Sequence, residues 1–221
     1  MVDIVGDNAS ATVEQIRSSG GVATAFTADV AQAAMVQRLI DDVTGAMGPL
    51  DVLVNSVGIF PRSAVVDMSE EEWDRVHATN LKSAFLLCRA VLPGMVERRR
   101  GRIVSVTSSL GLSGSATGAH YAASKAGLDA LMRSPSAEVA DHGVNVNNVA
   151  PGLTDTPMMR GANSPEYIQM LARRAPGSRL GQPATWSTLS SSSAVRERPT
   201  SPASFTTCAD TRAAQPPALR S

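Results

Sequence analysis

Short apolar runs typical of buried strands alternate with longer amphipathic stretches along most of this 221-residue chain. Strands separated by helices predict parallel β-α-β units with right-handed crossovers. We therefore expect an α/β fold built on a doubly wound parallel sheet. The expected strands cover 2–5, 22–27, 50–54, 102–107 and 144–149, and the expected helices cover 9–19, 32–47, 69–100 (with a break at Pro93) and 119–141.

Polar residues and turn formers follow several of these predicted strands. They are Asp3, Asp29, Asn55, Ser108 and the pair Pro151-Gly152. In an open parallel sheet, ligands bind outside the carboxyl ends of the strands. The pattern therefore predicts that the functional residues lie along this one edge of the sheet.

Tyr121 and Lys125 are the strongest candidates for chemistry. A spacing of four residues places their side chains about 5–6 Å apart on one face of a helix. A nearby ammonium favours the phenolate, so we expect Lys125 to lower the pKa of Tyr121 from its usual value near 10. Ser108 lies thirteen residues before Tyr121, at the end of a predicted strand. Its hydroxyl is expected to hold the oxygen whose proton moves. The alternative is a surface Tyr and Lys on an ordinary helix.

The segment just before Tyr121 contains two further features. His120 either lines the same cleft or is an incidental residue at a helix start, and the sequence favours the second interpretation. The Gly-rich stretch 111–118 fits neither a dinucleotide-binding motif nor a P-loop. It is interpreted as a flexible segment beside the cleft.

Composition and charge argue against several other classes of function. Lys plus Arg and Asp plus Glu balance at 20 each, so no net field attracts nucleic acid or an anionic membrane. The two cysteines, Cys88 and Cys208, are too few for a disulfide framework and form no zinc motif. The three histidines are scattered, so no metal site is expected. The sequence contains no signal peptide or long apolar run, and we expect a soluble cytoplasmic protein.

Several motifs, taken in order, carry a family resemblance. The first, Asn-Ser-Val-Gly at 55–58, is similar to an Asn-Asn-Ala-Gly motif. The others have the order and spacing of an Asn-Ser-Tyr-Lys tetrad, whose members here are Asn80, Ser108, Tyr121 and Lys125. With these motifs, residues 1–183 resemble the short-chain dehydrogenase/reductase family. The resemblance implies a Rossmann-like dehydrogenase domain over that range.

The resemblance also implies a role for each member of the tetrad in hydride transfer between NAD(H) and a secondary alcohol or ketone. Tyr121 moves a proton at the substrate oxygen, Lys125 lowers its pKa and binds the nicotinamide ribose, and Ser108 binds the substrate oxygen. Asn80 holds a water that relays protons to Lys125. The residues expected to bind the cofactor are Asp3, Asp29, Val30, Asn55, Gly58, Tyr121, Lys125, Pro151, Gly152 and Thr156.

Asp3 is expected to select the cofactor. By resemblance it ends the family's second strand, where a carboxylate accepts both hydroxyls of the adenosine ribose and repels a 2′-phosphate. This placement favours NAD over NADP, and the alternative is a solvated residue near a frayed terminus. Asp29 and Val30 are expected at the adenine edge, and Thr156 near the nicotinamide carboxamide.

Both ends depart from the family pattern. The Gly-rich turn that binds the pyrophosphate should precede Asp3, where only Met1 and Val2 stand, so the first β-α unit and a central strand are expected to be missing. After Ala184 the apolar periodicity collapses. Residues 184–221 are therefore expected to form an aberrant, disordered tail in place of the family's last strand.

A frameshift near Ala184 is one hypothesis for this tail. The next residues, Thr-Trp-Ser at 185–187, can be written ACG-TGG-TCN, and the frame one base earlier, GAC-GTG-GTC, encodes Asp-Val-Val. Asp-Val-Val is the kind of helix start expected at this point. The alternative is a natural low-complexity tail that is disordered or binds a partner.

Two functions follow from the sequence. The first is an NAD-linked oxidoreductase acting on a small secondary alcohol or ketone, a homo-oligomer by family resemblance, with no nucleic acid, membrane or metal partner. The second is a catalytically inactive remnant or interaction module that lacks the pyrophosphate-binding turn. The segment 158–180, where the substrate loop is expected, carries no recognisable specificity signal.

Overall fold

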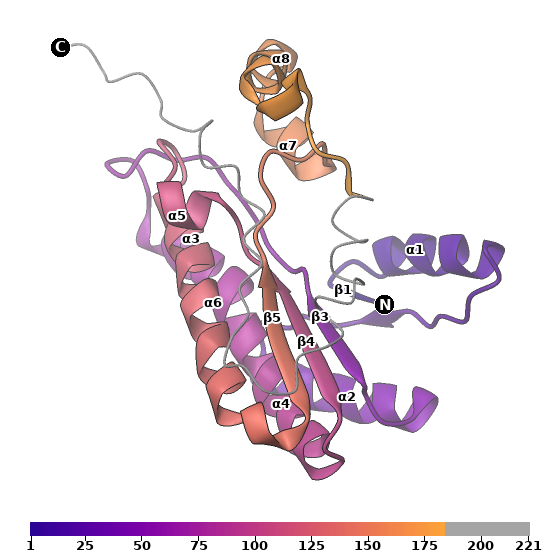
Figure 1. Ribbon diagram of the computed structural model, residues 1–221. Coiled ribbons are helices and arrows are strands. Elements are labelled where there is room, and N and C mark those ends of the chain that lie inside the picture. The colour runs from indigo at the N-terminus through magenta and orange to yellow at the C-terminus, as the bar shows by residue number, and fades with distance from the viewer. Residues whose placement is uncertain (184–221) are drawn as a thin grey trace.

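The computed structural model describes residues 1–183, and strands and helices alternate along them as predicted (Figure 1). The strands are β1 Val2–Asp3, β2 Phe26–Thr27, β3 Val52–Asn55, β4 Gly101–Val106 and β5 Val144–Val149. The helices are α1 Gly6–Ser18, α2 Ala33–Met47, α3 Glu70–His77, α4 Ser83–Glu97, α5 Leu110–Ser113, α6 Ala119–Glu138, α7 Pro157–Ala162 and α8 Pro165–Arg174. Shorter helical segments are η1 Ala78–Lys82, η2 Ala140–His142 and η3 Pro176–Ser178. The predicted tail and its frameshift, from Ala184 onward, lie outside the described residues.

The strands form two parallel sheets. One sheet has the order β1-β2 and the other the order β3-β4-β5. In the second sheet, residues 52–55 pair with 102–105, and residues 101–106 pair with 144–149. Helices connect the successive parallel strands, so the predicted α/β architecture is confirmed. None of the helices in residues 1–183 has the length and apolar character that a membrane crossing requires.

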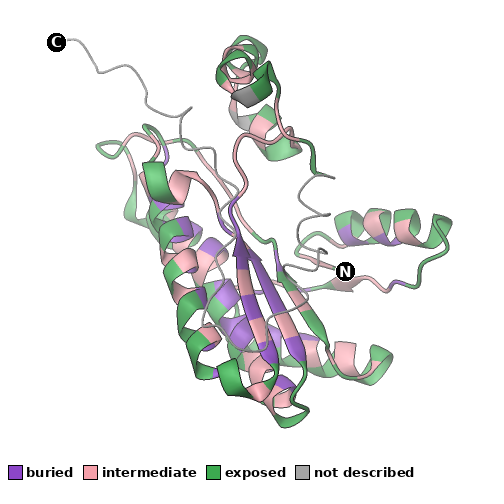
Figure 2. Cartoon of the chain, viewed as in Figure 1, coloured by how far each residue is buried: buried purple, intermediate pink, exposed green. Residues whose placement is uncertain are grey.

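Two hydrophobic clusters hold the layers together. The larger lies between the three-stranded sheet and helices α4 and α6, and Figure 2 shows buried residues concentrated along β4 and β5. Its most deeply buried members are Met95, Ile103, Leu128 and Met132. Full burial of one such side chain contributes about 1.5–3 kcal/mol to folding. The packing of α6 onto this sheet therefore determines which side chains of α6 face the carboxyl ends of the strands.

The second cluster joins the two sheets through α2 and α4. Its buried helix residues are Val36, Leu39, Leu86 and Leu87, and Val2, Phe26 and Leu53 of the strands pack against it. The two sheets thus share one core, although in the described residues no hydrogen-bonded strand pair joins β1 to β3.

The predicted strand 2–5 is reduced to β1, and two further predicted elements differ from the structure. The predicted helix 69–100 is divided by the π-helical turn η1, whereas Pro93, the expected break, lies inside α4. Such π turns are frequent at functional sites, and η1 carries Asn80. The predicted strand 22–27 is reduced to β2, because β1 offers it only two residues for pairing.

One face of β3 is apolar and open to solvent. Val52 and Val54 are 52% and 56% exposed, whereas Leu53 between them packs against the two cores. Alternate residues of a strand point to opposite faces of the sheet. The exposed valines therefore lie on the face away from α4, next to a strand edge that is unpaired in the described residues. An open edge with apolar side chains favours association between chains.

We predict that Val54→Lys reduces concentration-dependent aggregation, because a charge on this strand opposes pairing with another chain. The melting temperature should change little, since the side chain is already in water. Light scattering over a concentration series measures the effect. Val66→Lys, at a loop residue that is 91% exposed, is the matched control. Equal aggregation of the wild type and both variants would contradict the prediction.

Candidate active site

Ser108, Tyr121 and Lys125 lie together where β4 ends beside the first turns of α6. The side chains of Ser108 and Tyr121 are hydrogen-bonded. Lys125 Nζ lies 5.8 Å from the centroid of the Tyr121 ring and donates to the carbonyl oxygen of Val106 at 2.8 Å. A spacing of one helical turn puts Tyr121 and Lys125 on the same face, and packing of α6 on the sheet turns that face toward the end of β4. The structure thus brings three of the predicted tetrad into one cluster.

Asn80 joins this cluster from the π turn η1. Its Oδ1 accepts the N–H of Ile59 at 2.8 Å, and its Nδ2 donates to the Ile59 carbonyl oxygen at 3.0 Å and to Ser124 Oγ at 3.0 Å. The side chain is 1% exposed. Asn80 therefore ties the loop after β3 to α6, one residue away from Lys125.

Gly58 allows that loop to approach the cluster closely. A Cβ at this position would lie 3.4 Å from both Asn80 Oδ1 and Lys125 Nζ. A Cβ would therefore be in van der Waals contact with both atoms, and a side chain longer than that of alanine would meet the lysine. The glycine of the predicted motif is thus placed beside the tetrad.

Burial controls the electrostatics of the pair. Desolvation raises the pKa of Tyr121, opposed by its hydrogen bond with Ser108 and by the positive charge of Arg62. Desolvation also lowers the pKa of Lys125 to about 8. The expectation that Lys125 lowers the pKa of Tyr121 is therefore wrong for the protein without a ligand. The physical reason is that loss of water penalises the phenolate more than the Ser108 hydroxyl and the Arg62 charge stabilise it, while the Lys125 ammonium donates to the carbonyl oxygen of Val106.

These properties define what the cluster can do. A neutral phenol that is hydrogen-bonded to a neighbouring hydroxyl can give a proton to an oxygen placed between them. Tyr121 is 8% exposed, so most water is excluded from the place where this donation occurs. The arrangement suits proton transfer at a carbonyl or alcohol oxygen.

The cluster also fits the ribose end of a nicotinamide cofactor. An ammonium has three N–H donors, and only the bond to Val106 engages Lys125 Nζ in the described residues. A Cβ at Gly152, after β5, would meet no atom within 4 Å, so space remains beside the turn. The remaining N–H groups of Lys125 match the hydroxyl groups of such a ribose.

The other predicted cofactor residues are dispersed. Asp3 ends β1, and its Oδ1 accepts the N–H of Val5 at 2.8 Å, while Asp29 follows β2 and accepts the N–H of Ala31 at 2.9 Å. Both carboxylates thus belong to the two-stranded sheet and not to the Tyr121 cluster. Val30 is buried in the second core.

The turn after β5 lies closer to the cluster. The carbonyl oxygen of Pro151 accepts the N–H of Ser109 at 3.2 Å, which holds this turn next to Ser108. Thr156 is the N-cap of α7, and its Oγ1 accepts the N–H of Met159 at 3.2 Å. Of this turn, Pro151 thus lies next to the cluster, on the side expected to meet the nicotinamide half of a cofactor.

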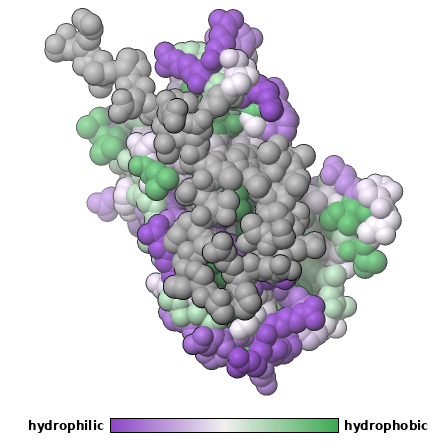
Figure 3. Space-filling model, in the orientation of Figure 1, coloured by the Kyte–Doolittle hydropathy of each residue, from purple (hydrophilic) through white to green (hydrophobic). Residues whose placement is uncertain are grey.

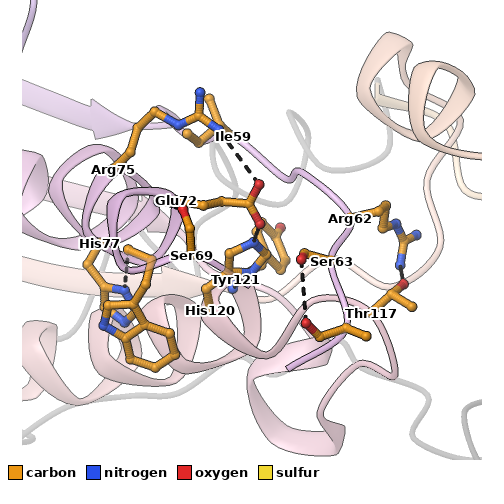
Figure 4. A network of polar contacts seen from close by, with 12 residues as sticks. Ile59, Arg62, Ser63, Ser69, Glu72, Arg75, His77, Thr117, His120 and Tyr121 are labelled. Atoms are coloured by element: carbon orange, nitrogen blue, oxygen red, sulfur yellow. Dashed lines mark hydrogen bonds and ion pairs between the residues drawn. The ribbon is translucent and has the colours of Figure 1, made fainter. Parts of the chain in front are cut away.

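His120 is a site residue whose position the sequence interpretation missed. It is fully buried, its Nε2 lies 3.1 Å from Glu72 Oε1, and its Nδ1 accepts the N–H of Tyr121 at 2.8 Å (Figure 4). Because Nδ1 accepts, Nε2 carries the proton toward the carboxylate. His120 therefore joins α3 to the first turn of α6 and holds the backbone of Tyr121, so it is not an incidental residue.

Phe60 was also missed. Its ring stacks on the ring of Tyr121 with centroids 4.0 Å apart and an interplanar angle of 21°. A Cβ at Gly118 would lie 2.4 Å from the Phe60 ring, so the absence of a side chain there makes room for the stack. The segment 111–118 is partly helical, since it contains most of α5. The segment predicted to be flexible thus contains part of a short helix, and Gly111 and Gly118 at its ends pack closely against α6 and Phe60.

The chain belongs to the short chain dehydrogenase family, whose model matches residues 1–166. It is 42% identical to a 3-oxoacyl-(acyl-carrier-protein) reductase of Vibrio cholerae serotype O1 over 67% of this chain and 60% of that protein. It is 38% identical to the enzyme of that name from Staphylococcus epidermidis over 80% of this chain and 72% of that protein. The family resemblance predicted from the sequence is confirmed.

Solved structures agree with this assignment. A gluconate 5-dehydrogenase from Burkholderia cenocepacia in complex with NADP and tartrate is similar with a TM-score of 0.81 and 26% identity. The match covers 94% of this chain and 82% of that one. A 3-oxoacyl-(acyl-carrier-protein) reductase from Brucella melitensis has a TM-score of 0.80 and 32% identity, with 92% and 79% covered. The fold is thus that of known short-chain dehydrogenases and reductases.

We predict that burial of Lys125 makes stability rise with pH. Its pKa is about 8 in the folded protein and near 10.5 when unfolded, so between these values the unfolded chain binds more protons. The free energy of unfolding should therefore increase from pH 7.5 to pH 10, by up to about 3 kcal/mol from this group. Lys125→Met should lose that increment.

Urea unfolding of the wild type and Lys125→Met across this pH range measures the difference. The matched control is Lys82→Met, which removes the other lysine of the chain, an exposed one. A stability difference between the wild type and Lys125→Met that stays constant with pH would show that the ammonium is not desolvated as described.

Proposed function

We propose that this chain is a cytoplasmic, nicotinamide-dependent oxidoreductase that interconverts a small secondary alcohol and its ketone. The proposed catalytic residues are Asn80, Ser108, Tyr121 and Lys125. The observation that carries the proposal is the hydrogen-bonded pair of Ser108 and Tyr121 with the buried Lys125 ammonium beside it. Family membership supports the reaction class.

Each side chain has a task in this proposal. The nicotinamide ring of NAD, when bound, would accept or donate the hydride. Tyr121 gives a proton to the substrate oxygen in reduction and takes it back in oxidation, because a bare alkoxide is too basic to persist near neutral pH. Ser108 holds the same oxygen through its hydroxyl. Lys125 offers its remaining N–H groups to the cofactor ribose, and Asn80 fixes the loop that covers them and holds the water of the proposed proton relay.

NAD is proposed as the preferred cofactor on the basis of Asp3. A carboxylate at the end of β1 would accept the adenosine ribose hydroxyls and repel a 2′-phosphate. Asp29, Val30, Asn55 and Gly58 complete the proposed adenosine side, and Pro151, Gly152 and Thr156 the nicotinamide side. NADP in the similar Burkholderia structure is the competing choice.

A homo-oligomer is proposed through the faces of α4 and α6. An apolar hollow of about 540 Å³ opens there, lined by Leu81, Phe85, Gly127 and Leu131 among others. Phe85 is 43% exposed although it is a large apolar side chain. A second copy of the chain would cover this surface and bury the ring.

Two substrate classes are candidates. The similar proteins are described as 3-oxoacyl-(acyl-carrier-protein) reductases and as a gluconate 5-dehydrogenase. The match to the Vibrio protein spans 60% of its length, so neither activity is carried over as a property of this chain. The shared chemistry is a ketone or secondary alcohol, attached in one case to a carrier thioester and in the other to a sugar acid.

Tyr121→Phe should abolish turnover, with a loss of about 10²–10⁴-fold or more, because the hydroxyl is the group that moves the proton. NADH affinity should stay within a few-fold of the wild type. NADH oxidation with a panel of ketones and NADH binding by calorimetry measure the two quantities. Ser108→Ala should cost less, since this hydroxyl orients the substrate oxygen. A Tyr121→Phe variant with wild-type turnover would refute the assignment.

Replacing Asp3 by Ala should shift preference toward NADP, because the carboxylate no longer repels the 2′-phosphate. The ratio of kcat/KM for NADH and NADPH measures this. Asp29→Ala is the control, since its carboxylate follows β2 and is expected at the adenine edge. A wild-type protein that already prefers NADPH would show that Asp3 does not face the ribose.

The second candidate is an interaction module without catalysis. It is favoured by the edges of β1 and β3 that are unpaired within residues 1–183. Calorimetric titration with NADH separates the two functions. Saturable binding supports the oxidoreductase, and no binding at millimolar NADH supports the module.

A further inference from the structure

Arg62 places a positive charge beside the Tyr121 cluster, which consists of Asn80, Ser108, Tyr121 and Lys125. The residue lies in the loop after β3 and is exposed. Its guanidinium carbon sits 4.2 Å from the centroid of the Phe60 ring, and that ring stacks on Tyr121. Arg62 also contributes to the electrostatic environment of the Tyr121 hydroxyl. One aromatic ring therefore separates the guanidinium from the proposed proton donor.

Neutral acceptors hold the guanidinium in place. Nη1 donates to Ser115 Oγ at 3.5 Å and to Thr117 Oγ1 at 3.4 Å, and Nη2 donates to Asn163 Oδ1 at 3.0 Å. Figure 4 shows the contact between Arg62 and Thr117 in the same view as Tyr121. The partners come from the segment before α6 and from the junction of α7 and α8. Arg62 thus bridges the chemical cluster and the lobe 158–180 in which the substrate loop is expected.

No carboxylate neutralises this charge within residues 1–183. The ion pairs of that part of the chain involve other cations, and Asp155, just before the lobe, is paired with Arg160 at 2.7 and 2.8 Å. A guanidinium has five N–H donors. The two bonds of Arg62 to hydroxyl oxygens are long, at 3.4 and 3.5 Å, and it makes one shorter bond, to the amide oxygen of Asn163. The planar fork therefore keeps capacity for an anion.

We infer that Arg62 binds a carboxylate of the substrate, so that the reacting alcohol or ketone is a hydroxy acid or an oxo acid. This inference rests on the proposed function and narrows its substrate class. A carboxylate matches the guanidinium in both charge and planar shape. A phosphate carries more negative charge, and Arg160, the cation at the start of the same lobe, is already paired with Asp155. A 3-oxoacyl group on a carrier thioester would leave Arg62 without an anion next to the reacting carbon.

The test compares acids with uncharged analogues of the same shape. Levulinate and 5-oxohexanoate are titrated into the full chain by calorimetry, with and without NADH, next to their primary amides. At least one acid should bind about 10- to 100-fold more tightly than its amide, as expected for a charge-assisted hydrogen bond. This preference should shrink at high salt, because the charge is exposed.

Arg62→Met should bring the ratio of acid to amide affinity close to one, and Arg62→Lys should retain part of it. Arg173→Met, which removes an exposed arginine from α8, is the matched control and should keep the wild-type ratio. If Arg62 only braced the loops, its loss would weaken acid and amide alike and leave the ratio unchanged. An unchanged ratio in Arg62→Met would overturn the inference. So would equal binding of acid and amide by the wild type, or no binding of either.

Turnover separates this inference from the proposed function. An acid preference that depends on Arg62, together with no NADH oxidation that depends on Tyr121, would keep the carboxylate site and reject the oxidoreductase. Oxidation of NADH with acid and amide at equal kcat/KM would keep the oxidoreductase and reject the carboxylate site.

Discussion

Lys125 carries its ammonium into the protein, where Nζ donates to the carbonyl oxygen of Val106 and only 5% of the residue stays exposed. That contact requires α6 to lie flat against the end of β4, and the packing of Leu128 and Met132 on the sheet provides it. The same packing places Tyr121 beside Ser108. Burial of the lysine charge costs folding free energy, and the apolar core offsets that cost. The charge itself serves the proposed reaction.

The neighbours of Tyr121 position it from several directions. Phe60 stacks on one face of its ring, the Ser108 hydroxyl meets its phenol, and His120 accepts its backbone N–H. Burial raises the pKa of the phenol, so the protein without ligand keeps Tyr121 as a neutral proton donor. Figure 3 shows hydrophilic side chains gathered over the lobe that carries α8. Asn80, Tyr121 and Lys125 of the cluster are buried. The proposed reacting groups are thus shielded from water, and the α8 lobe is hydrophilic. Arg62 connects the two, because it packs on Phe60 and donates to Asn163.

Local patterns predicted much of this from the sequence. The strand and helix alternation, the parallel pairing and the convergence of Ser108, Tyr121 and Lys125 follow from periodicity, strand-end position and the one-turn spacing. What the sequence could not predict depends on contacts between distant segments. His120 meets Glu72 and Arg62 meets Asn163 only after the chain folds, and neither pair has a characteristic spacing. The pKa of Tyr121 was predicted with the wrong sign because spacing reports the lysine nearby but not the loss of water around the phenol.

The ionisation of Tyr121 tests the central claim most directly. The chain has two tyrosines, so an ultraviolet titration of the wild type minus that of Tyr121→Phe isolates this phenol. We expect it to ionise above pH 10 in the protein alone and at a clearly lower pH with saturating NAD, whose binding adds positive charge beside it. Lys125→Met should reduce that change, because Lys125 is proposed to hold the nicotinamide ribose beside Tyr121. A phenol that ionises at the same pH with and without NAD would contradict the account of Tyr121 as the acid and base of the site.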